Sequence, residues 1–275
     1  MPELPEVETI ARGLDKRIAG DVIESVWLGS KPEPLKSSAG KIAATLESSR
    51  ISGVHRVGKH IVFDLKNGKV RTKALAQRQV QWIVHLGMTG SLLVCSPEHE
   101  LAKHTHAILR LASGRELRFV DPRRFGRLSV IEKFEAPGAE PLEIVLEDFA
   151  ALFRGRKTPI KSALLNQNLL SGVGNIYADE ALFRAGIRPR RRAASLTHDE
   201  LRRLYLALKK VLREAIRMGG SSIADYVDAD GEEGFFQLKH RVYGREGESC
   251  LACKRSIKRI VIAGRSSHYC PRCQK

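Results

Sequence analysis

Apolar side chains recur at helical spacing near the start of the chain. Between residues 5 and 20 they form one face, made of Val7, Ile10, Ala11, Leu14 and Ile18. Pro5 suits the first helical position and Gly20 suits the stop. The pattern predicts an amphipathic helix over residues 5–20, which leaves the first residues on a short lead into a packed element.

From residue 22 to residue 131 the pattern changes to short apolar or alternating runs. Eight runs have the length and composition of strands: Val22–Trp27, Ile51–Val57, Ile61–Leu65, Trp82–Leu86, Ser91–Val94, Thr105–Leu111, Glu116–Val120 and Arg127–Ile131. Turn signals separate them, and Asn67-Gly68 and Ser113-Gly114 are typical of hairpins. Short runs at this spacing predict a β-sandwich of antiparallel strands.

The pattern becomes helical after Glu135–Glu143, a stretch interrupted by proline and glycine that we interpret as a linker. The clearest helix is Leu196–Met218, which Thr197 can cap. A polar, glycine-bearing stretch then runs from Gly219 to Gly234. We therefore expect an α+β multidomain protein.

Charge changes the picture from fold to partner. The 275 residues include 47 Lys+Arg against 31 Asp+Glu, a net charge of +16. A polyanion, most simply nucleic acid, is the natural partner, and a merely basic soluble protein is the alternative. No apolar run approaches the ~20 residues of a membrane helix, and no secretory segment opens the chain. We expect a soluble, cytoplasmic protein.

Four of the five cysteines lie near the C-terminal end, in the pattern C-x2-C-x16-C-x2-C: Cys250, Cys253, Cys270 and Cys273. This spacing predicts one structural zinc ion in a closed four-thiolate site, with a metal-free thiol cluster as the alternative. Basic residues between the two pairs favour a hairpin presented to phosphates: Lys254, Arg255, Lys258, Arg259 and Arg265. Cys95 is expected to be a core thiol.

Two glycine-bearing segments have chemical content. Gly172, Gly174 and Asn175 precede a predicted helix, an arrangement that directs backbone N–H groups at an anion but also occurs in plain helix–helix turns. Gly58 and His60 flank Lys59 in a turn between two strands. There Lys59 can reach a phosphate or a reacting sugar. The alternative is a solvated lysine, which is more common in such a turn.

The turn Asp121–Gly126 couples two cations, Arg123 and Arg124, to the aromatic Phe125. Arginine with an apolar wedge can enter a base stack and hold it open. The alternative that the same sequence allows is a surface turn whose Phe125 side chain is buried in the core.

The chain opens with Met1-Pro2-Glu3. A small second residue favours removal of the initiator methionine, which would leave Pro2 with a secondary amine. Such an amine titrates near ~8, so a neutral, nucleophilic fraction exists at physiological pH. Glu3 beside it can donate or accept a proton. An ordinary start with Glu3 facing the helix dipole is the alternative.

Taken together, these residues resemble the formamidopyrimidine-DNA glycosylase family over nearly the whole chain. The motifs that carry the resemblance are Pro2–Glu8, the Lys59 turn, His85–Gly90, Asp121–Gly126, Gly172–Glu180, Ala229–Gly231, Tyr243–Arg245, Gly264-Arg265 and Cys270–Gln274. The resemblance implies a catalytic β-sandwich domain over residues 1–134, a helix–two-turn–helix domain over 143–240 and a zinc finger over 241–275. The implied partner is damaged double-stranded DNA, bound by a monomer.

The resemblance also implies roles for single residues. Pro2 is the nucleophile that attacks C1′, Glu3 is the acid and base, and Lys59 contacts a phosphate and assists. Asn175 and Arg265 grip phosphates beside the lesion. Further DNA contacts fall on Met88, Arg123 and Phe125, which fill the gap left by the flipped base, and on Arg124, His104 and Arg156. Arg123 reads the opposite cytosine, and residues 219–234 close over the flipped 8-oxoguanine.

The chain departs from the family pattern near Arg71–Val80, a basic and polar surplus that we expect to extend a hairpin. Two rivals remain. An endonuclease VIII-type glycosylase shares Pro2, Glu3 and the zinc hairpin but prefers oxidised pyrimidines. A catalytically silent DNA-binding protein needs only the charge, the phosphate turn and the zinc hairpin. An RNA-binding zinc ribbon is less favoured, because no aromatic stacking sheet is predicted.

Overall fold

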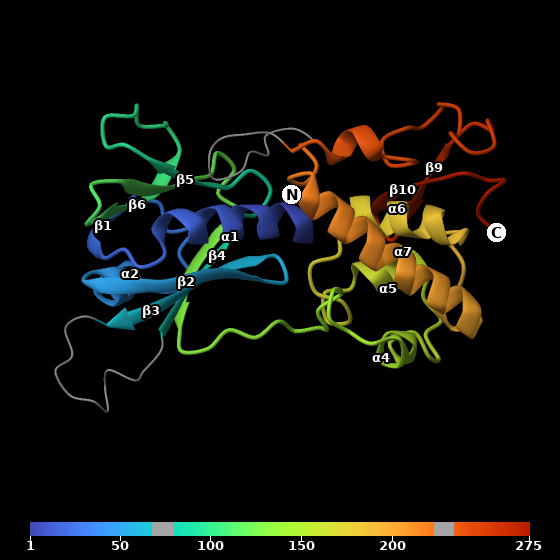
Figure 1. Cartoon of the computed structure of the whole chain (residues 1–275), viewed down its shortest axis with the longest axis horizontal. Coiled ribbons are helices and arrows are strands. Elements are labelled where there is room, and N and C mark those ends of the chain that lie inside the picture. Colours follow the sequence, from blue (N-terminus) through green and yellow to red (C-terminus); the bar gives the residue numbers. More distant parts are fainter. Residues whose placement is uncertain (68–79, 223–233) are drawn as a thin grey trace. The chain divides into compact units, whose positions relative to one another are not determined.

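The computed structural model describes residues 1–67, 80–222 and 234–275 (Figure 1). The chain divides into two compact units. The N-terminal unit comprises residues 1–135 and 219–234, and the C-terminal unit comprises 136–218 and 235–275. Most of the predicted extension near Arg71–Val80 and most of the loop predicted over 219–234 lie outside the described residues.

The predicted N-terminal helix is confirmed as α1 (Leu4–Ile18). Pro5 lies in its first turn, and its apolar face is buried. Helix α1 packs against two neighbouring strands, β2 (Ser49–Val57) and β3 (His60–Asn67). The packing fixes the helix start, from which the first residues project.

Among the described residues, the strands of the N-terminal unit form two four-stranded antiparallel sheets. One has the order β1-β6-β7-β5 and the other β2-β3-β4-β8. The remaining bounds are β1 (Ile23–Leu28), β4 (Val80–His85), β5 (Ser91–Cys95), β6 (Thr105–Leu111), β7 (Glu116–Val120) and β8 (Arg127–Ile131). All eight predicted strands and the antiparallel sandwich are confirmed.

The sandwich core joins side chains of both sheets and of α1, including Leu14, Phe63, Trp82 and Phe119. A short helix that the pattern did not predict, α2 (Ala39–Leu46), adds Ile42 and Leu46 to this core. Cys95 is half-buried at the end of β5, so its placement as a core thiol is wrong.

Helices dominate the C-terminal unit: α4 (Leu146–Ala151), α5 (Ile160–Leu165), α6 (Asn175–Ala185) and α7 (His198–Arg217), with 3-10 turns at Ala193–Ser195 (η1) and Phe236–Lys239 (η2). The long predicted helix is confirmed as α7, and Thr197 caps it together with Glu200. Helix α6 packs on both α5 and α7, which fixes its N-terminus.

The chain ends in a two-stranded hairpin, β9 (Lys258–Ile262) and β10 (Arg265–Tyr269), as the basic stretch between the cysteine pairs predicted. Its two-residue turn has positive φ at both Ala263 and Gly264, which is typical of a tight hairpin. Strand β10 also packs on α6. Within the described ranges, no helix has both the length and the apolar character needed to cross a membrane.

Candidate functional site

The first residues of the chain are held in place by α1. Glu3 is 4% exposed, and its backbone N–H donates to Glu6 Oε2 at 2.8 Å. Pro2 beside it is half-buried, whereas Met1 is exposed. The carboxylic side chain of Glu3 is therefore buried next to Pro2, and removal of Met1 would free the amine of Pro2.

Glu6 also holds the first described end of the 219–234 segment. Its Oε1 accepts from the backbone N–H of Ser221 at 2.8 Å. Gly220 lies so close that a β-carbon there would be 2.9 Å from Glu6 Cγ. At the other end, Gly234 N–H donates to Ser222 Oγ at 2.7 Å. One buried carboxylate thus connects the start of α1 to the base of this segment, a role that periodicity alone did not indicate.

Lys59 lies in the tight turn between β2 and β3, and it is buried, at 9% exposure. The solvated-turn alternative is therefore wrong. Arg56 connects this turn to α1, because it donates to Glu8 Oε2 at 2.7 Å and to Gly58 O at 3.1 Å. Although burial alone would raise it, the charges and hydrogen bonds of Arg56 and Arg12 hold the pKa of Glu8 below its usual value.

Two histidines lie beside the Lys59 turn. His60 and His85 are paired across β3 and β4, with ring centroids 4.9 Å apart. Burial, with the nearby charges of His60, Arg127 and Lys59, lowers the pKa of His85 to about 4. Its imidazole is therefore neutral at pH 7, and Nδ1 accepts from Gly87 N–H at 3.1 Å. Sequence reasoning gave His85 no role of its own, since the register of two strands brings it here.

The proposed gap-filling residues are exposed on the N-terminal unit. Met88 is 44% and Phe125 54% exposed, so the alternative that buries Phe125 in the core is wrong. Arg123 Cζ lies 4.9 Å from the centroid of the Phe125 ring, a cation–π arrangement. Arg124 pairs with Glu33 at 2.8 Å, and His104 is exposed on the loop before β6.

In the C-terminal unit, Asn175 is the first residue of α6, after Gly174. Its Nδ2 donates to Ser266 Oγ at 3.2 Å, and its buried Oδ1 has no hydrogen-bond partner among the residues that the structure describes. Ser266 follows Arg265, which is exposed at the start of β10. The fold therefore brings together the helix start and the hairpin that the sequence placed far apart. Arg156 is exposed and donates to Leu152 O.

A buried ion pair holds β10 against the start of α6. Lys161 of α5 and Asp179 of α6 are both fully buried, with Nζ and Oδ1 2.7 Å apart. Lys161 Nζ also donates to Ser266 O at 2.5 Å. Asp179 accepts from Ser267 Oγ at 3.1 Å and from His268 N–H at 2.8 Å. Strand β10 is thus fixed to α5 and α6 by charge.

Glu180, the next residue of α6, fixes the segment that leads into the cysteine module. Burial raises its pKa, and backbone N–H groups of Tyr243, Val242 and Arg241 oppose that effect by donating to its oxygens. The sequence signal for both anchors is a pair of adjacent acids, Asp179 and Glu180, in the middle of helix α6.

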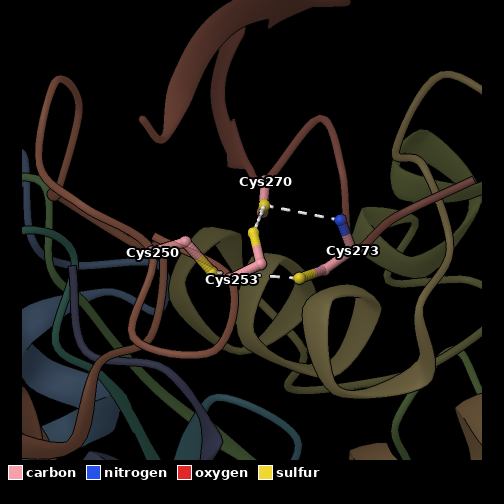
Figure 2. Close-up of side chains that lie close together, drawn as sticks. All are labelled: Cys250, Cys253, Cys270 and Cys273. Atoms are coloured by element: carbon pink, nitrogen blue, oxygen red, sulfur yellow. Dashed lines mark hydrogen bonds between the residues drawn. The ribbon is translucent and has the colours of Figure 1, made fainter. Parts of the chain in front are cut away.

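The four C-terminal cysteines converge, as Figure 2 shows. All four Sγ atoms lie within 4.8 Å of one another, with 3.9 Å between those of Cys250 and Cys273 and 3.4 Å between those of Cys253 and Cys270. Tetrahedral zinc with Zn–S bonds of ~2.3 Å needs sulfurs about 3.8 Å apart, so the donor set fits. These cysteines form the site of one structural zinc ion, with Cys250 and Cys253 before β9 and Cys270 and Cys273 after β10.

Comparison with known proteins covers nearly the whole chain. Three family models match in order: "Formamidopyrimidine-DNA glycosylase N-terminal domain" at residues 1–128, "Formamidopyrimidine-DNA glycosylase H2TH domain" at 137–227, and "Zinc finger found in FPG and IleRS" at 247–275. A formamidopyrimidine-DNA glycosylase of Solibacter usitatus is 46% identical, with 100% of each chain covered. One of Thermus thermophilus is 45% identical, over 100% of this chain and 98% of its own.

Solved structures agree with the sequence relatives. The crystal structure of MutM (Fpg) from Thermus thermophilus matches with a TM-score of 0.85 at 43% identity, over 99% of this chain and 98% of that one. A Lactococcus lactis Fpg mutant in complex with Fapy-dG-containing DNA matches with a TM-score of 0.88 at 32% identity, over 100% of both chains.

Proposed function

The chain belongs to the formamidopyrimidine-DNA glycosylase family, and on that premise we propose that it is a bifunctional DNA glycosylase and AP lyase of base-excision repair. Its substrates are oxidised purines, 8-oxoguanine and formamidopyrimidines, in duplex DNA. Fapy-dG-containing DNA bound by a relative of the same fold supports this substrate class.

The proposed chemistry starts at the N-terminal amine. Once Met1 is removed, the neutral amine of Pro2 attacks C1′ of the flipped nucleotide. The N-glycosidic bond breaks and its electron pair leaves with the base. Glu3 supplies the proton that opens the sugar and then shuttles protons between steps. Because Pro2 is a secondary amine, the product is a charged iminium on C1′.

The same intermediate supports strand cleavage. The iminium draws electrons from C2′, so a proton is lost there and the 3′ phosphate leaves by β-elimination. Elimination of the 5′ phosphate follows, and hydrolysis of the iminium returns the amine. One residue therefore serves both activities, while the zinc ion stabilises the hairpin and takes no part in the bond changes.

DNA is bound from several elements. Flipping the lesion costs a few kcal/mol, which phosphate contacts and inserted side chains offset. We assign phosphate contacts to Lys59, Asn175 and Arg265. The gap is filled by Met88, Arg123 and Phe125, with Arg123 reading the opposite cytosine, and further DNA contacts come from His104, Arg124 and Arg156. The protein acts as a monomer, in the cytoplasm of a bacterium at its nucleoid.

The observation that carries the proposal is the placement of Glu3. Its side chain is buried at the start of the packed helix α1, directly after Pro2, and its backbone N–H donates to Glu6. Arg56 connects the turn of the buried Lys59 to the same helix, so the Lys59 amine is a second functional group fixed to α1. A silent DNA-binding protein needs neither. The exposed set of Met88, Arg123 and Phe125 favours a purine-lesion enzyme over the endonuclease VIII type.

Borohydride trapping tests the proposal directly. The protein is incubated with a duplex containing 8-oxoguanine opposite cytosine, reduced, and mapped by mass spectrometry; a matched thymine-glycol duplex is run beside it. We expect an adduct on an N-terminal Pro2, with faster excision of 8-oxoguanine. No adduct from protein that begins at Pro2 and binds the duplex would refute the assignment, and preference for thymine glycol would favour the pyrimidine enzyme.

A further inference from the structure

Two turns of the N-terminal unit lie back to back. One, residues 86–90, follows β4 and carries Met88; the other, residues 121–126, joins β7 to β8 and carries Arg123 and Phe125. Gly87 has φ +65°, and a β-carbon there would lie 2.6 Å from the backbone of the second turn. The two turns are therefore in direct backbone contact, with no room for adjustment by a side chain.

A single buried carboxylate joins them. Asp121 is 0% exposed, and its Oδ1 accepts from Thr89 Oγ1 at 2.6 Å. The same oxygen accepts from Arg123 N–H at 3.2 Å, and Oδ2 accepts from Gly126 N–H at 2.7 Å. The donors thus come from the residue after Met88 and from both sides of Phe125.

Asp121 is itself fixed to the sandwich. Its N–H donates to His104 O at 2.9 Å, and its carbonyl oxygen is 2.9 Å from His106 Nε2. Gly126 lies against the core, since a β-carbon there would be 2.5 Å from the ring of Phe119. Hydrogen bonds to a buried, charged acceptor are shorter and stronger than neutral ones. The joint formed by Asp121 and Thr89 is therefore both rigid and anchored.

We propose that Asp121 and Thr89 are positioning residues that hold the two turns as one wedge, and so set the place from which Arg123 reads the opposite base. This inference rests on the proposed function. A side chain that enters a base stack must stay in place although the separated bases tend to restack. A preorganised group loses less free energy on ordering than a mobile one. Neither residue contacts the reacting atoms.

Thr89→Val tests the joint, because it removes the hydroxyl at nearly constant shape; Thr89→Ser, which keeps the hydroxyl, is the matched control. Single-turnover excision of 8-oxoguanine is measured opposite cytosine and opposite adenine. Thr89→Val loses the charge-assisted hydrogen bond to Asp121 and also the oxygen that accepts from Arg123 N–H at 3.3 Å. This should lower its cytosine-to-adenine rate ratio by about tenfold. Thr89→Ser should keep the wild-type ratio.

The ratio separates positioning from folding, since a smaller active fraction lowers both rates equally. Asp121→Asn provides a second variant: its amide has one acceptor oxygen, which cannot serve both Arg123 N–H and Gly126 N–H, so its ratio should also fall. An unchanged ratio in Thr89→Val would overturn the inference while leaving the enzyme assignment intact. A wild-type protein that excises neither duplex would overturn both, whereas one that excises both duplexes without preferring cytosine would overturn the inference alone.

Discussion

Replacement of the buried Lys161 of the C-terminal unit should loosen the β9–β10 hairpin, to which we assign a phosphate contact through Arg265. Lys161→Met keeps an unbranched side chain, one atom shorter, but removes its charge, and it leaves Asp179 buried without that partner. It also removes the donor to Ser266 O, next to Arg265. We therefore expect two effects of one change: lower stability and weaker DNA binding.

The magnitude follows from burial and from the remaining partners. Both side chains are fully buried, and breaking such a pair by removing one partner costs about 3–5 kcal/mol. Asp179 keeps Ser267 and His268 as hydrogen-bond donors, so Lys161→Met should cost about 3 kcal/mol. Asp179→Asn should cost about 5 kcal/mol, because the ammonium of Lys161 stays buried without that negative charge. Removing both charges should cost much less than the sum, by at least about 2 kcal/mol.

Urea unfolding followed by circular dichroism at 222 nm measures this cycle, because the C-terminal unit holds most of the long helices. Fluorescence anisotropy on a lesion duplex measures binding under conditions where each variant is folded. Additive single effects, or a loss below about 1 kcal/mol for Lys161→Met, would refute the reasoning. So would normal DNA affinity in a folded variant.

Three further outcomes are expected. Pro2→Gly and Glu3→Gln should lower single-turnover excision by at least about 100-fold while anisotropy shows nearly normal DNA binding; wild-type rates would contradict these roles. Cys270→Ser should lose zinc, measured by metal analysis, together with DNA affinity, and tight binding by a zinc-free variant would argue against the coupling. Burial lowers the pKa of His240 to about 4, whereas an unfolded histidine titrates near ~6.5. The contribution of His240 to stability should therefore be complete above pH ~6.5 and decline toward pH 4 by up to ~1.4 kcal/mol per pH unit, in addition to the decline that His85 causes. The free energy of unfolding in urea should fall less steeply with acid in His240→Asn than in the wild type, and equal slopes would count against this.

Local pattern was enough for the elements that carry their own signal. Period-2 runs and turn residues predicted all eight strands of the sandwich, and the cysteine spacing predicted the zinc site. The short helix α2 escaped because its eight residues bury only Ile42 and Leu46, too few for a periodic signal. The anchors escaped for another reason. Glu6, Asp121 and Asp179 act through partners far along the chain, and only the folded register brings those partners together.

The zinc site and the buried ion pair act on one strand from two sides, and this leads to a last prediction. Cys270 continues directly from β10, while Asp179 binds Ser267 and His268 within it. When either the zinc site or the ion pair is lost, the remaining one holds only one end of β10. The loss of one should therefore already release Arg265 from its fixed position. The DNA affinity lost in Cys270→Ser combined with Lys161→Met should therefore be smaller than the sum of the two single losses. Anisotropy titrations of the three variants, each with its folded fraction checked, measure the difference, and strictly additive losses would mean that metal and ion pair support DNA binding independently.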